Sequence, residues 1–288
     1  MKGPKGSIPP YVALPMMHPS GGAAYLGSGA APFVVNSDPN SPDFAVPDLV
    51  PPLTVDGNRL DRRQELLAGI DRFASSTEIE ANKQAKSLNT FQNKAFDLIT
   101  SSETRKAFDL AQEPAELRDA YGRNSLGQMC LMGRRLVEAG VRCVTLQHND
   151  WDTHYNNFRV LKNDLLPHLN TGLPALLTDL SNRGMLDSTM VICMGEFGRT
   201  PRINNEAGRD HWGPTNTIIM AGGGIQGGRI VGATDAKGER PDGDSHGPED
   251  LAATIYQCLG INPKQEFITP EGRPVSIVND GKVIEELL

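Results

Sequence analysis

The sequence has no long hydrophobic run, no export signal and no excess of positive charge. No apolar stretch in its 288 residues approaches the roughly 20 residues that a helix needs to cross a bilayer. The first six residues lack the apolar core of a signal peptide. The formal net charge is −7 and no block of Lys and Arg interrupts it, which argues against a surface that binds nucleic-acid phosphates. We therefore expect no membrane span and no nucleic-acid partner.

Cysteine is scarce, and the common catalytic motifs are absent. The four cysteines are far apart and lie in apolar patterns instead of the paired spacings of a metal site; they are Cys130, Cys143, Cys193 and Cys258. We expect buried free thiols, because a free cysteine behaves as a small hydrophobe. The sequence also lacks a Gly-x-Ser-x-Gly elbow and a His-Glu-x-x-His helix, which argues against the commonest serine hydrolases and zinc peptidases.

Proline and glycine are concentrated at the start of the chain. Residues 1–58 contain helix-breaking pairs such as Pro9-Pro10 and Pro51-Pro52. This composition predicts an extended segment that packs on a main domain formed by residues 59–288. Within the segment, Tyr11–Leu14 is a candidate short strand.

The rest of the chain alternates helical and strand patterns. Apolar residues at three- and four-residue steps predict two helices over 60–110, one over 114–139, one over 158–184 that Pro167 and Pro174 kink or split, and one over 248–259. Apolar runs predict strands at 141–147, 190–194 and 217–221, and a hairpin through Ile230-Val231. This alternation is typical of an α/β fold with a parallel-type sheet flanked by helices. We expect the strands at 141–147 and 190–194 to be neighbours in that sheet.

Ligand-type side chains follow these two strands. Asp152 and His154 come just after the first strand, Glu196 follows the second, and Asp210 and His211 lie in the next loop. Because loops converge beyond the carboxyl ends of parallel strands, we expect the five side chains to meet. Carboxylates and imidazoles in one place favour a cation among them, and mixed O and N ligation suits Zn²⁺, Mn²⁺ or a harder ion such as Ca²⁺. The sequence therefore predicts a divalent metal site.

Arg199 stands three residues after Glu196. Its guanidinium can pair with a carboxylate or bind a phosphate or sulfate oxyanion, and we assign it the catalytic role of assisting the oxyanion. The competing explanation is structural: the aspartates cap helices, the histidines bond to loop backbone, and Glu196 and Arg199 form an ion pair. Three further residues are weaker ligand candidates, namely His148, Asp150 and His246.

Three motifs together resemble the sulfatase-like bacterial family labelled domain of unknown function 1501. They are Trp151–His154, Met194–Pro201 and Gly208–Trp212, and shorter matching stretches lie at 107–110, 121–123, 135–141 and 249–255. That family is similar to the alkaline phosphatase superfamily, whose members hydrolyse phosphate or sulfate esters with two divalent metals and a Ser, Thr or modified Cys nucleophile. The resemblance implies an alkaline-phosphatase-like fold and a small-molecule or polysaccharide ester as substrate.

The resemblance also implies roles for the motif residues. Asp152 and His154 match the superfamily's first downstream Asp/His ligand pair. Glu196 takes the place of the Asp in its Asp-His-Gly motif, and His211 resembles its last His ligand. Phe197 stands where that motif has its His, so that the second metal site is altered or is completed by Asp210-His211.

The early metal-binding Asp and the nucleophile of the superfamily have no counterpart in the sequence. By the resemblance, the chain corresponds to the C-terminal two-thirds of the family and is a truncated product, a gene fragment or half of a split gene, without the N-terminal part and its export signal. Full-length members are expected in the periplasm or at the cell surface. We expect a metal-dependent hydrolase module for phosphate or sulfate esters that is inactive alone if the N-terminal half is missing. The alternatives are a non-catalytic metal- or carbohydrate-binding module and an incomplete fragment that never folds alone.

Overall fold

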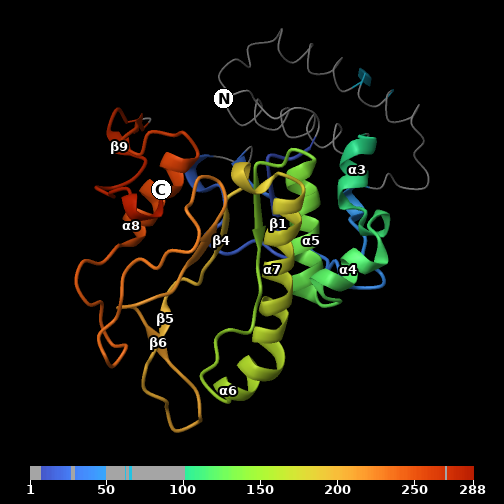
Figure 1. Ribbon diagram of the computed structural model, residues 1–288. Helices are drawn as coiled ribbons and strands as arrows, with labels where there is room; N and C mark the ends of the chain where they lie inside the picture. Colours follow the sequence, from blue (N-terminus) through green and yellow to red (C-terminus); the bar gives the residue numbers. More distant parts are fainter. Residues whose placement is uncertain (1–7, 27–29, 50–61, 63–64, 67–100, 270) are drawn as a thin grey trace. The chain divides into compact units, whose positions relative to one another are not determined.

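The computed structural model describes residues 8–26, 30–49, 62, 65–66, 101–269 and 271–288 (Figure 1). The chain forms two compact units. The first consists of Met1–Asn149 with His168–Leu176, and the second of Asp150–Pro167 with Leu177–Leu288. Helices accompany a three-stranded parallel sheet, which confirms the α/β class. The domain boundary expected near residue 58 lies outside the described residues.

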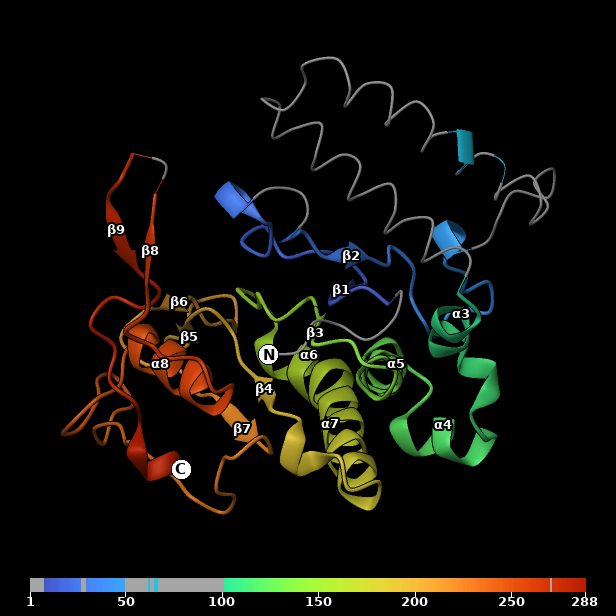
Figure 2. The same cartoon turned by 90° about the horizontal axis from the view of Figure 1, so that it is seen from above.

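A parallel sheet in the order β2-β1-β3 is the basis of the first unit (Figure 2). The strands are β1 (Tyr11–Leu14), β2 (Phe33–Val34) and β3 (Cys143–Leu146). Val12 of the central strand is opposite Phe33 on one side and Val144 on the other, and it is completely buried. The strands predicted at 11–14 and 141–147 are confirmed. The Pro/Gly-rich segment thus supplies two strands of the sheet itself.

Three α-helices precede β3 in the described part of the first unit. They are α3 (Ser102–Phe108), α4 (Ala115–Tyr121) and α5 (Ser125–Glu138), with short 3₁₀ turns at Ala24–Leu26, Pro47–Leu49 and Leu110–Gln112. The single helix predicted over 114–139 is wrong. Gly122, with φ of 89°, ends α4, and the Asn124 side chain caps α5 by accepting the N–H of Gly127 at 2.9 Å. Of the helices predicted over 60–110, residues 60–61, 63–64 and 67–100 lie outside the described residues.

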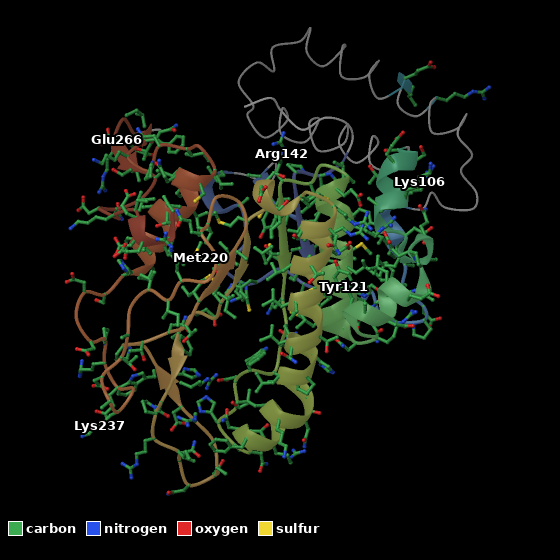
Figure 3. All side chains as sticks on the ribbon, viewed as in Figure 1. Lys106, Tyr121, Arg142, Met220, Lys237 and Glu266 are labelled. Carbon is green, nitrogen blue, oxygen red and sulfur yellow. The ribbon has the colours of Figure 1, made fainter. Side chains whose placement is uncertain are left out.

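Helix α5 contributes several buried apolar side chains to the core of this unit. Its Gly133 faces Val144 and Leu146, which lets the helix pack closely on β3. Tyr121 of α4, labelled in Figure 3, is completely buried. A Cβ on Gly127 would lie 2.1 Å from the Tyr121 carbonyl oxygen, so the turn between α4 and α5 requires a glycine at this position. Close packing of helix on sheet therefore depends on small residues.

A long helical stretch connects β3 to β4. It consists of α6 (Asn157–Val160), a π-helical turn (Leu161–Leu165) and α7 (Leu166–Asn182). Pro167 is at the start of α7 and Pro174 lies inside it. The helix predicted over 158–184 is thus confirmed, with its irregularity at the π-helical turn. Every helix in the described part of the chain is too short or too polar to cross a bilayer.

The second unit contains small antiparallel pairs. They are β4 (Val191–Cys193) with β7 (Ile219–Ala221), β5 (Gly198–Arg199) with β6 (His211–Trp212), and β8 (Glu266–Ile268) with β9 (Pro274–Ser276). The predicted final helix is α8 (Pro248–Cys258), and 3₁₀ turns occur at Leu186–Ser188 and Glu285–Leu287. The strands predicted at 190–194 and 217–221 are confirmed.

Two expectations about strand pairing are wrong. The strand at 190–194 does not pair with the one at 141–147, because β3 is bonded to β1 and β4 runs antiparallel to β7. The hairpin expected through Ile230-Val231 is not formed, and the described residues nearby carry an isolated bridge between Thr234 and Pro241. All four cysteines are free, but only Cys130 is buried.

Candidate metal centre

The segment after β3 turns tightly and presents two ligand-type side chains to solvent. The N–H of Thr153 donates to the Trp151 carbonyl at 2.9 Å, and the N–H of His154 donates to the Asp152 carbonyl at 3.1 Å. Thr153 is only 6% exposed, and its hydroxyl donates to the Asn157 side chain at 2.5 Å. Because Thr153 is buried, its neighbours lie on the open side: Asp152 is 66% and His154 39% exposed.

The strands β5 and β6 hold the other half of the site (Figure 1). Arg199 of β5 is opposite His211 of β6 in the antiparallel register. Beyond this pair, the N–H of Thr200 donates to the Asp210 carbonyl at 2.9 Å, and the Thr200 hydroxyl accepts the N–H of Asp210 at 3.0 Å. The guanidinium of Arg209 donates to the carbonyls of Thr200 and Pro201. The loop of residues 200–210 is therefore closed at its base by many hydrogen bonds.

Asp152, His154 and His211 meet as a triangle of donor atoms. Asp152 Oδ1 lies 3.1 Å from His154 Nε2 and 2.9 Å from His211 Nε2, and the two Nε2 atoms are 3.1 Å apart. Ligand atoms bonded to a divalent ion at about 2.0–2.2 Å lie roughly 3.0–3.5 Å from one another. The three atoms are thus spaced as they would be around one ion, and their mixed O and N character suits Zn²⁺ or Mn²⁺. The three residues could hold an ion of the predicted kind.

Hydrogen bonds keep both aspartates of the site ionised. The guanidinium of Arg199 and then the imidazole of His211 lower the pKa of Asp152 to about 2. The imidazole of His154 and the amide of Asn204 lower the pKa of Asp210. Both carboxylates remain charged at neutral pH and Arg199 pairs with one of them, so the carboxylates outnumber the guanidinium by one, a balance that favours a cation.

Asp210 is placed behind His154, outside the triangle. Its Oδ1 lies 2.8 Å from His154 Nδ1, whereas the nitrogen that faces the triangle is Nε2. Histidine ligands in metal sites usually donate their second N–H to a carboxylate in this way. The structure therefore puts Asp210 where a supporting residue would be and not among the grouped ligand atoms.

Of the other predicted residues, Arg199 contacts the triangle, whereas Glu196 lies outside the group. The Arg199 guanidinium pairs with Asp152 and also donates to the Arg209 carbonyl at 3.2 Å. Glu196 is an exposed residue between β4 and β5 and does not belong to the three-residue group, the one such group found in the described residues. The weaker candidates Asp150 and His246 are also exposed and also lie outside this group. In the first unit, His148 lies beside His168, with ring centroids 6.2 Å apart.

The two aspartates and two histidines of the site make other contacts than the helix caps and backbone bonds of the structural explanation. Neither aspartate caps a helix among those whose caps are described, and both carboxylates contact imidazoles instead. The histidine side chains contact carboxylates and each other, with ring centroids 4.8 Å apart, rather than loop backbone. Phe197 also packs on His211, at 4.4 Å between ring centroids. The four residues thus form one side-chain cluster.

Asn204 is a residue of the site that the sequence did not predict. Its side-chain amide donates to the His154 carbonyl and to the Asp210 carboxylate, and it accepts the N–H of Gly208. A Cβ on Gly208 would be 1.8 Å from the His154 carbonyl oxygen, so the loop can only approach this segment through a glycine. An Asn followed by Gly a few residues later is a turn signal, but it does not reveal these contacts.

Comparison with known proteins gives one match. A family model described as "Protein of unknown function (DUF1501)" matches residues 1–288. No curated protein and no solved structure matches the chain. The family resemblance drawn from the three motifs is confirmed, while the kinship with sulfatases and alkaline phosphatases stays a prediction.

Proposed function

We propose that this chain, which belongs to the DUF1501 family, is a divalent-metal-dependent hydrolase module that acts on phosphate or sulfate esters. The observation that carries the proposal is the triangle of Asp152 Oδ1, His154 Nε2 and His211 Nε2, with edges of 2.9–3.1 Å. The ester chemistry rests on the resemblance of the motifs to the sulfatase-like members of the alkaline phosphatase superfamily. An alkaline-phosphatase-like fold is part of the same proposal.

The residues of the site have distinct roles in this proposal. Asp152, His154 and His211 would hold the ion, and a bound ion would supply Lewis acidity toward a phosphoryl or sulfuryl oxygen. Arg199 uses one terminal nitrogen for Asp152 and the other for the Arg209 carbonyl. A guanidinium has five N–H donors, so further donors remain for an oxyanion of the substrate. Arg199 would therefore link the ion's carboxylate ligand to the transferring group.

A second candidate is a non-catalytic metal- or carbohydrate-binding module. The hydroxyls of the two threonines that flank the site are both used in local bonds. Thr153 donates to Asn157 on the buried side, and Thr200 donates to the Arg202 carbonyl at 2.8 Å. Neither is presented as a nucleophile to the triangle. This observation favours binding without turnover if no other part of the protein supplies the nucleophile.

Metal content tests the part that both candidates share. The purified chain should hold about one equivalent of Zn²⁺ or Mn²⁺ by inductively coupled plasma mass spectrometry, and Asp152→Ala should lower that content. The matched control is Asp119→Ala, because Asp119 is 62% exposed and pairs with Arg123 as Asp152 pairs with Arg199. A cooperatively folded wild-type chain that takes up neither metal would refute the site.

Turnover separates the two candidates. Hydrolysis of an aryl phosphate or aryl sulfate by the metal-loaded chain, lost in Asp152→Ala and kept in Asp119→Ala, supports the hydrolase. Metal binding with no turnover of either ester supports the binding module. An Arg199→Lys variant adds information, because lysine keeps the charge but loses the planar fork that bonds two groups at once.

A further inference from the structure

Asn204 connects the two segments that form the metal site. Its Nδ2 donates to the His154 carbonyl at 2.9 Å and to Asp210 Oδ1 at 3.1 Å. Its Oδ1 accepts the N–H of Glu206 at 3.0 Å and that of Gly208 at 2.9 Å. The amide has donors on one side and an acceptor on the other, so these four partners allow one orientation of the side chain. Asn204 is thus fixed in place by its own loop.

A continuous path of hydrogen bonds runs from Asn204 to the triangle. Asp210 Oδ1 receives Asn204 Nδ2 and lies 2.8 Å from His154 Nδ1, while His154 Nε2 lies 3.1 Å from His211 Nε2. Both nitrogens of the His154 ring face a carboxylate, which only accepts: Nδ1 lies 2.8 Å from Asp210 Oδ1, and Nε2 lies 3.1 Å from Asp152 Oδ1. A neutral ring has a single N–H, and the shorter contact favours its place on Nδ1. The lone pair of Nε2 then faces the triangle, as a metal ligand requires.

We propose that Asn204 and Asp210 are positioning residues that fix the tautomer and the ring orientation of His154. This inference rests on the proposed function, because it assigns to His154 a ligand role through Nε2. Nothing in the sequence motif distinguishes Asp210 from a ligand, whereas the structure puts it on the far nitrogen of the ring. Asn204 acts on the His154 ring indirectly, because it bonds the carboxylate of Asp210 and the backbone carbonyl of His154.

An isosteric exchange at Asn204 gives the sharpest test. In Asn204→Asp, an oxygen replaces Nδ2 and faces the His154 carbonyl and the Asp210 carboxylate, so two attractions become repulsions. The Kd for Zn²⁺ should rise about 10- to 100-fold, the usual effect of changing a partner that orients a histidine ligand. Asn262→Asp is the matched control, because Asn262 Oδ1 accepts the N–H of Lys264 at 3.0 Å, a bond that a carboxylate makes equally well. This control should bind Zn²⁺ as the wild type does.

A second variant keeps the test valid if Asn204→Asp does not fold. Asp210 is 52% exposed, so Asp210→Ala removes the carboxylate without opening a cavity. In the metal-free chain, the ¹⁵N chemical shifts of the His154 ring report which nitrogen carries the proton. The wild type should show the Nδ1–H tautomer, and Asp210→Ala should lose this preference. A purely structural role for Asp210 would leave the tautomer unchanged.

The outcomes separate this inference from the proposed function. A wild-type ring protonated on Nε2 overturns the inference, as does an Asp210→Ala chain that binds Zn²⁺ as tightly as the wild type. A wild-type chain with the Nδ1–H tautomer that binds no Zn²⁺ overturns the proposed function but supports the path from Asn204 to His154. Weaker Zn²⁺ binding in both variants together with the tautomer change supports both proposals.

Discussion

Replacing Gly208 by Ala should separate the loop of residues 200–210 from the segment that carries His154. The new Cβ would lie 1.8 Å from the His154 carbonyl oxygen and 2.0 Å from its carbon, and both are backbone atoms that cannot rotate away. Contacts below 3.0 Å essentially never occur for a Cβ, so the two segments must move apart by about 1.2 Å. No left-handed backbone strain is involved at this position.

The expected loss of unfolding free energy follows from the hydrogen bonds between the two segments. The N–H of Arg209 donates to the Thr153 carbonyl at 3.1 Å, the N–H of Asn157 donates to the Ala207 carbonyl at 3.0 Å, and Asn204 Nδ2 donates to the His154 carbonyl at 2.9 Å. A displacement of about 1.2 Å stretches all three beyond hydrogen-bonding distance. At roughly 0.5–1.5 kcal/mol each, the loss of these three bonds destabilises the second unit by about 1.5–4.5 kcal/mol.

The assay is urea denaturation together with a Zn²⁺ titration, and Gly213→Ala is the control. A Cβ on Gly213 would meet nothing within 4 Å, so the control changes the same atom at an open position. Gly208→Ala should also bind Zn²⁺ more weakly, because a shift of about 1 Å exceeds the roughly 0.5 Å within which a site must hold its ligands. If Gly208→Ala is within about 0.5 kcal/mol of the control and binds Zn²⁺ equally well, the reasoning is refuted.

Three further predictions concern the first unit. Glu113→Gln should cost about 1–3 kcal/mol in urea denaturation, because Arg134, 1% exposed, would lose the carboxylate that lies 2.8 Å from its guanidinium but keep that of Glu138 at 2.5 Å; a cost below about 0.5 kcal/mol would contradict this. Burial opposes ionisation of Glu113, but hydrogen bonds from Arg134 and Arg135 outweigh it and lower the pKa. The ionised Glu113 therefore stabilises the fold above the ordinary pKa of 4.5, and this stabilisation is lost as the pH falls through the lower pKa of the folded state. Glu113→Gln should accordingly make the urea midpoint depend less on pH below about 4.5. Finally, Gln128→Leu should lower the free energy of unfolding by about 2–4 kcal/mol, since Gln128 is completely buried and its side chain bonds the Arg118 guanidinium, the Arg118 carbonyl and the Gly122 carbonyl; an unchanged urea midpoint would show that the three bonds contribute little.

Local patterns in the sequence were sufficient to predict several elements. The apolar run at 190–194, the helix opened by Pro248 and the short strand at 11–14 all occur in the structure. Each depends on features within a few residues, such as apolar periodicity or a proline at a helix start. The break between α4 and α5 was missed because Gly122 and Asn124 act through a cap, whose geometry the apolar periodicity does not reveal.

Pairing between distant segments could not be predicted in the same way. β3 was expected beside 190–194 because a helix connects them, yet its partner is β1, from the Pro/Gly-rich segment. The ligand residues Asp152, His154 and His211 were predicted from their chemical type, whereas their convergence comes from the β5–β6 pair and the loop of residues 200–210. Glu196 was predicted on the same grounds as these ligands but does not join them, because residue type alone does not specify side-chain distance.

The central position of β1 has a consequence for how the first unit folds. Tyr11 pairs with Cys143, which lies 132 positions later in the chain. Closing a flexible loop of that length costs roughly 4 kcal/mol of chain entropy before any strand contact offsets it. During synthesis, the apolar edge of β1 that β3 covers is therefore exposed until about half of the chain has been made. Such non-local parallel pairing is slow, so the rate of folding and the tendency to aggregate should depend on how soon β3 reaches β1.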